Sequence, residues 1–154
     1  MQRRNFLMAA MAVPALAHAH HGWSSFDQER PIYLEGKVVR SKWQNPHAEL
    51  MLEVPADLKL PADLGMRQVP AQSAPVDGKA LLTRATLPKR RDRRWEIELA
   101  PLTRLETWKV PEIKVGASIS VLGFIFKEEK GEPILRAEYL FVDGKAYGLR
   151  SSPV

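Results

Sequence analysis

The chain has 154 residues, with 23 lysines and arginines, 18 aspartates and glutamates, four histidines and no cysteine. The lack of cysteine excludes thiol catalysis, thiolate zinc sites and iron–sulfur clusters, and it leaves the fold to be held by its apolar core. The length suits one domain with a single core.

The N-terminal residues 1–19 have the pattern of an export signal. Arg3 and Arg4 precede an apolar stretch that is shorter than the roughly 20 apolar residues a membrane span needs. Paired arginines in this setting predict a twin-arginine signal, a route that exports folded proteins; an ordinary secretory signal is the alternative. We therefore expect a periplasmic protein with no stable insertion in a membrane.

Two positions satisfy the small-residue rule for signal cleavage, and each exposes histidine. Cleavage after Ala19 makes His20 the first residue, and the mature chain 20–154 then carries 21 basic and 18 acidic residues, a net charge of +3. Cleavage after Ala17 makes His18 the first residue. We favour the cut after Ala19, because Ala17 and Ala19 place small residues at both required positions.

Apolar residues recur at every second position in several stretches, which is typical of β-strands. We expect strands over residues 31–43, 48–54, 94–99, 118–126 and 134–142. Gly36, inside the first of them, marks a bend or bulge. Asn45-Pro46-His47 supplies the turn between the first two strands, and residues 101–108 have the pattern of a short helix.

The order of these elements predicts an all-β domain, a small five-stranded OB-like barrel with one short helix between strands 3 and 4. A small open β-sandwich is the competing architecture, and the helix favours the barrel. Residues 55–93 are a long Pro-rich excursion in which regular structure is interrupted. The predicted organisation is a cleaved signal peptide at 1–19 and one barrel domain at 20–154.

Several segments of the mature chain form a recognisable pattern. They are HHGWSSFD (20–27), IYLEGKV (32–38), WQNPH (43–47), WEIELA (95–100), IKVG (113–116) and SVLGF (120–124). Together they resemble a family of small exported bacterial proteins, the domain of unknown function 6152. The resemblance implies a periplasmic OB-like fold and no assigned biochemistry. The excursion at 55–93 departs from the pattern of that family.

The histidines are the main candidates for chemistry. A mature N-terminal His20 offers its α-amino group and its imidazole to one metal ion, and His47 on the first hairpin turn is a third nitrogen ligand. His21 is a candidate fourth ligand. Copper(II) heads the affinity order of divalent ions for such ligands, ahead of zinc and nickel. With the other cut, His18-Ala19-His20 is itself a square-planar copper or nickel motif. The alternative interpretation is that these histidines are exposed and have no role.

The remaining patterns favour a binding protein over an enzyme. No arrangement of acid, base and nucleophile appears, and Glu96 and Glu98 are expected to face solvent on the outer side of a strand. The basic run 89–94 has a net charge of +4 and is expected to be a solvated loop, or else a contact for a partner protein. Aromatic residues are expected to fill the core or seal one end of the barrel.

We therefore predict a non-catalytic periplasmic binding protein that binds copper through His20, His21 and His47. The alternative is an OB-type module that binds a small ligand or a partner protein with no metal. Export argues against nucleic acid as the partner.

Overall fold

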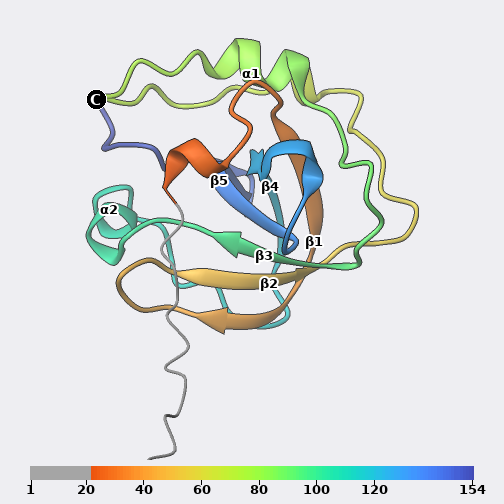
Figure 1. The fold of residues 1–154 in the computed structure, drawn as a ribbon. Coiled ribbons are helices and arrows are strands. Elements are labelled where there is room, and N and C mark those ends of the chain that lie inside the picture. Colours follow the sequence, from red (N-terminus) through yellow and green to blue (C-terminus); the bar gives the residue numbers. More distant parts are fainter. Residues whose placement is uncertain (1–21) are drawn as a thin grey trace, which may run out of the picture.

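The computed structural model describes residues 22–154, and the chain folds around a closed barrel of five β-strands (Figure 1). Helical turns and two short helices lie between the strands. The elements are η1 (Trp23–Ser25), β1 (Ile32–Lys42), β2 (Glu49–Glu53), η2 (Leu64–Met66), α1 (Gly78–Arg84), β3 (Arg94–Glu98), α2 (Leu102–Thr107), β4 (Ser118–Ile125), η3 (Lys127–Glu129), β5 (Ile134–Val142) and β6 (Lys145–Gly148).

The strand pairing confirms the predicted barrel. Antiparallel pairs join β1 to β2, β2 to β3, β1 to β4, and β4 to β5. The barrel closes where β3 runs parallel to β5, with Ile97 opposite Leu135. Helix α2 lies between β3 and β4, as predicted, and it buries Leu105 in the main core. A closed sheet has no open edges among these five strands, which distinguishes the fold from an open sandwich.

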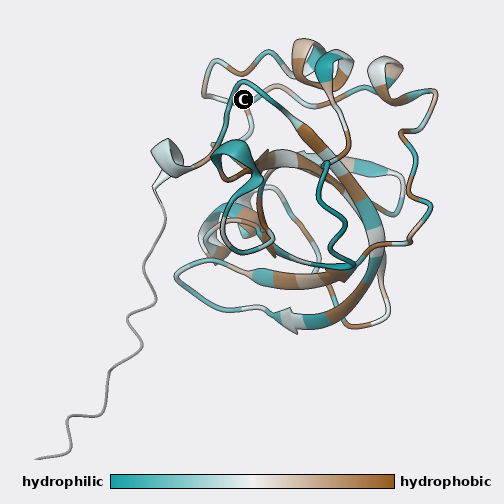
Figure 2. Ribbon diagram, turned by 45° about the vertical axis from the view of Figure 1, so that its right-hand side comes forward, coloured by the Kyte–Doolittle hydropathy of each residue, from teal (hydrophilic) through white to brown (hydrophobic). Residues whose placement is uncertain are grey.

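Alternating side chains of the strands fill the barrel interior. Ile32, Leu34 and Val38 of β1 lie in one core cluster and are at most 1% exposed. Brown and teal bands alternate along the strands in Figure 2, as expected when only one face of each strand is buried. At Gly36 an added Cβ would lie 1.9 Å from the main-chain oxygen of Glu53, so only glycine lets β1 pass so close to β2.

Residues 55–93, called the strap below, cross over the outer face of the barrel. Leu64 and Leu82 of the strap are 3% and 2% exposed and lie in a second apolar cluster with Tyr33 and Tyr139. In Figure 1 this segment runs from yellow to green across the top of the barrel. Helix α1, which we did not predict, begins after Asp77, whose carboxylate accepts a hydrogen bond from the Ala80 amide. The Pro-rich excursion therefore provides a second core layer.

Strand β6 was also not predicted. It pairs with the C-terminal half of β5 through the tight turn at Asp143-Gly144, where both residues have positive φ. That dipeptide is typical of a two-residue hairpin turn. Among residues 22–154, no helix has both the length and the apolar character required to cross a membrane.

Candidate functional site

His47 is the predicted metal ligand that the structure describes. It lies in the loop between β1 and β2, after a cis Asn45-Pro46 bond. Its side chain is 20% exposed, and its Nδ1 lies 3.5 Å from Oε1 of Glu49. His20 and His21 lie outside the described residues. Within residues 22–154, no three His, Cys, Asp or Glu side chains are placed to hold a metal ion.

Three carboxylates lie beside His47 on the outer face of β2 and β3. Glu49 is directly opposite Glu98 in the strand register, and Glu96 is the next outward residue of β3. Burial raises the pKa of Glu96, and the charges of Glu49 and Glu98 raise it further. Cations balance two of these carboxylates, because Lys42 lies 3.6 Å from Glu49 and Arg136 lies 2.8 Å from Glu98.

The expectation that Glu98 faces solvent is wrong. Glu98 is 5% exposed, and its Oε2 accepts hydrogen bonds from Arg136 Nε at 3.0 Å and from Nη2 at 2.8 Å. The cause is the parallel pairing of β3 with β5, which places Arg136 opposite Glu98. Local alternation in the sequence contains no information about this long-range neighbour.

The raised pKa of Glu96 gives a pH-dependent prediction. Because the folded-state value lies above the unfolded value, ionised Glu96 costs stability at neutral pH, and this cost disappears on protonation. We expect Glu96→Gln to raise the free energy of unfolding at pH 7. The difference from the wild type should shrink as the pH falls towards the ordinary glutamate value of about 4.3.

Urea denaturation at a series of pH values measures this difference. Glu53→Gln is the matched control, because Glu53 pairs with Arg94 at the surface and both side chains are well exposed. A lower stability of Glu96→Gln at pH 7 would contradict the assignment.

Trp23 is held between two arginines on the outer surface of the barrel. Its ring centroid lies 3.8 Å from the guanidinium carbon of Arg150 and 5.0 Å from that of Arg136. Arg150 in turn forms an ion pair at 2.7 Å with Glu138, whose side chain is fully buried. We call Trp23, Arg136 and Arg150 the Trp23 clamp. It fixes the position of Trp23 on the barrel surface.

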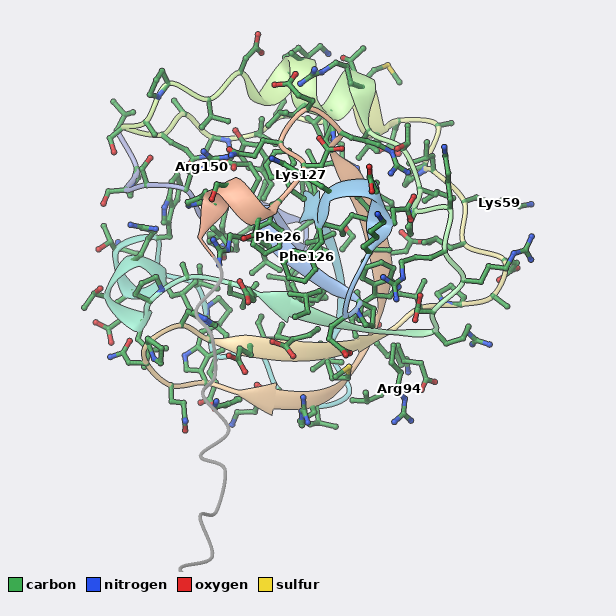
Figure 3. The ribbon with its side chains drawn as sticks, in the orientation of Figure 1. Phe26, Lys59, Arg94, Phe126, Lys127 and Arg150 are labelled. Atoms are coloured by element: carbon green, nitrogen blue, oxygen red, sulfur yellow. The ribbon has the colours of Figure 1, made fainter. Side chains whose placement is uncertain are left out.

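The aromatic residues are divided between the barrel core and the second apolar cluster outside it. Trp95 is 1% exposed and lies in the main barrel core, as predicted for these residues. Phe26 instead lies outside the barrel in the second cluster, where it stacks on Phe126 with ring centroids 4.8 Å apart (Figure 3). The N-terminal segment is therefore fastened to the barrel surface by Trp23 and Phe26.

A groove of about 960 Å³ lies elsewhere on the molecule, between the strap and the outer face of the sheet. Its lining includes Glu35 and Lys37 of β1, Ser120 of β4, Phe141 of β5 and Arg67 of the strap. Sequence reasoning missed this groove because its walls come from segments that are far apart in the chain. No periodic pattern signals such a site.

The basic run 89–94 is in part an internal support. Arg90 forms an ion pair with Asp92 and donates hydrogen bonds to the main-chain oxygens of Glu129 and Gly131. Arg93 Nε donates to the main-chain oxygen of Val54 at 2.7 Å. These two side chains therefore hold the loop against the barrel.

Glu129 holds the same loop from the other side. Its carboxylate accepts hydrogen bonds from the main-chain amides of Lys89 and Arg90 and forms a 2.8 Å ion pair with Arg30. Burial acts to raise the pKa of Glu129, but these amides and the Arg30 guanidinium outweigh it and lower the pKa. In contrast, Arg94 points away from the molecule at the lower rim in Figure 3. The exposed side chains of Lys89, Arg91 and Arg94 are the part of the run that remains for a partner.

A comparison with known families finds a match over about a third of the chain. Residues 7–60 match the model of DUF6152, a family of unknown function. The predicted resemblance is confirmed over this region, which includes Trp23, β1, His47 and β2. The DUF6152 match ends within the strap, and the later segments that suggested the same family lie beyond it. No curated protein and no solved structure matches the chain.

Proposed function

We propose that the protein is an exported, non-catalytic binding protein of the bacterial periplasm, and that it binds copper(II) through its N-terminal histidines and His47. Export is supported by the paired arginines, the short apolar stretch and the small residues at Ala17 and Ala19. The copper proposal depends on where the chain leaves the barrel.

The Trp23 clamp is the observation that carries this proposal. Trp23 lies over Arg136 of β5, and the neighbouring strands across the outer face are β3, with Glu98, and β2, with Glu49. Adjacent strands are about 4.8 Å apart, so β2 lies about 10 Å from β5. Three extended residues span up to about 10 Å, and His20 precedes Trp23 by three positions. This spacing supports the proposal that His20 can reach His47.

The ligand chemistry suits copper. The α-amino group and imidazole of His20 provide two nitrogens, and the imidazole of His47 provides a third; His21 is the fourth candidate. Imidazole and amine ligands suit copper(II), which binds them more tightly than zinc or nickel. The carboxylate of Glu49, 3.5 Å from His47 Nδ1, adds negative charge beside the cation.

A copper titration of the exported protein tests the proposal. The mass of the exported chain gives the cleavage site, and competition with a chromogenic chelator gives the copper(II) affinity. We expect His47→Ala to weaken binding about tenfold or more, because one of three nitrogen ligands is lost. A glycine added before His20 should have a similar effect, because the free α-amino group then belongs to the glycine and no longer to His20.

Two controls make the result decisive. Gln44→Ala changes an exposed residue of the same loop and should leave the affinity unchanged. The peptide HHGWSSFD carries the N-terminal histidines without the barrel. If this peptide binds copper as tightly as the whole protein, or if His47→Ala binds like the wild type, the copper site is wrong.

The second candidate function is an OB-type module that binds a small ligand without a metal. The groove under the strap favours it, since small-molecule sites are commonly concave and partly apolar. The basic run is a weaker basis for a protein partner, because Arg90 and Arg93 hold the loop to the barrel. Binding at the groove does not depend on the histidines.

A further inference from the structure

The groove between the strap and the sheet has a polar floor with an apolar patch. Ser118 and Ser120 of β4 contribute hydroxyl groups, and Phe141 of β5 contributes a half-buried ring. Arg67 of the strap forms one wall. A ligand that fits this lining needs both a polar group and an apolar part.

The charges of the groove are unequally neutralised. Two carboxylates of the groove have partners. Glu35 accepts a hydrogen bond from the Tyr33 hydroxyl, and Glu53 forms an ion pair with Arg94. The side chains of Lys37 and Lys145 are exposed and make no hydrogen bond or ion pair in the described part of the chain. These two ammonium groups are therefore available to a ligand.

Arg93 and Asp143 are two further charged residues that line the groove. Arg93 donates a hydrogen bond to the Val54 main-chain oxygen, which leaves its positive charge without a counter-ion. Asp143, at the exposed hairpin turn, has no side-chain partner among residues 22–154, and the carboxylate of Glu35 has only the neutral Tyr33 hydroxyl. The lining charges without a counter-ion are therefore three cations and two anions, a net positive charge.

Arg67 is positioned as a fixed cation beside an aromatic surface. Its guanidinium carbon lies 5.2 Å from the ring centroid of Phe141 and 5.7 Å from that of Tyr33. Its Nε faces Oδ2 of Asp63 at 3.4 Å. The terminal nitrogens have no protein partner in the described residues, so they are free to donate to a carboxylate, phosphate or sulfonate.

We propose that this groove binds a small organic anion, with its acidic group held by Lys37, Lys145 and Arg67 and its apolar part against Phe141. The inference rests on the second candidate function and is independent of the copper site. The positive charges of the groove favour an acidic group on the ligand. The Phe141 ring favours a ligand with an aromatic or aliphatic part over a bare inorganic ion.

Naphthalene-1-sulfonate is a suitable probe, because it joins one anion to one aromatic body. Added to the mature ¹⁵N-labelled protein, it should shift the amide resonances of Ser118, Ser120 and Gly144. The double variant Lys37→Gln/Lys145→Gln should bind the probe about tenfold more weakly, because two charge-assisted contacts are lost. A matched cation, 1-naphthylmethylammonium, should bind at least tenfold more weakly than the sulfonate.

The control variant is Lys59→Gln/Lys114→Gln, which removes the same charge from exposed lysines that do not line the groove. Lys59 points away from the barrel in Figure 3. This control should bind the sulfonate like the wild type. Equal binding of sulfonate and ammonium, or equal losses in the two double variants, would overturn the anion assignment while leaving the groove as a ligand site. If neither probe shifts the groove amides, both the assignment and the small-ligand function at this groove are wrong.

Discussion

Gly36→Ala is expected to lower the free energy of unfolding by about 3 kcal/mol or more, one of the two largest effects we predict. The added methyl group would lie 1.9 Å from the Glu53 oxygen and 2.8 Å from the Glu53 carbonyl carbon. Both are main-chain atoms held in the β1–β2 pairing, so no side-chain rotation relieves the clash. Urea denaturation followed by circular dichroism measures the loss.

Gly65→Ala is the matched control for this substitution. Its added Cβ would be 3.9 Å from the nearest atoms of Thr83, an ordinary contact, and its φ is not in the left-handed region. We expect a change within about 0.5 kcal/mol. If Gly36→Ala is no less stable than Gly65→Ala, the close approach of β1 to β2 is wrong.

Glu98→Leu is expected to lower the free energy of unfolding by about 3 kcal/mol. The Glu98 and Arg136 side chains are 7% and 14% exposed, so removal of the carboxylate leaves Arg136 charged and poorly solvated. The same guanidinium lies over the rings of Trp23 and Phe26, and its displacement would also loosen those contacts. Thermal and urea denaturation both report the loss.

The double variant Glu98→Leu/Arg136→Leu separates the ion pair from simple packing. Because replacement of both partners removes the uncompensated charge, it should recover a large part of the stability lost in Glu98→Leu. Glu53→Leu, which breaks the exposed pair with Arg94, should cost less than about 1 kcal/mol. Equal costs for Glu98→Leu and Glu53→Leu would contradict a buried pair.

The barrel could be predicted because its strands bury one face each. Leu50 and Leu52 occupy every second position between Glu49 and Glu53, Ile97 lies between two glutamates, and all three apolar residues lie in the barrel core. Such strands depend on neighbours only a few residues away, and these are visible in the sequence. The bulge expected at Gly36 lies instead between Val38 and Arg40, where the β1–β2 register shifts, and Gly36 is the point of close approach to Glu53.

The features that were missed depend on neighbours far along the chain. Glu98 is buried only because Arg136 comes to lie opposite it, and Leu82 is buried only because the strap folds back onto the barrel. The groove likewise joins Lys37, Arg67 and Lys145 from three separate regions. Periodicity describes which face of a strand is apolar, but it does not say what covers the other face.

The Trp23 clamp joins two ends of the described chain that are synthesised at different times. Trp23 precedes every barrel strand and emerges early from the ribosome, whereas its partner Arg150 is made only after all five barrel strands. The contact between Trp23 and Arg150 therefore forms only after translation has passed residue 150.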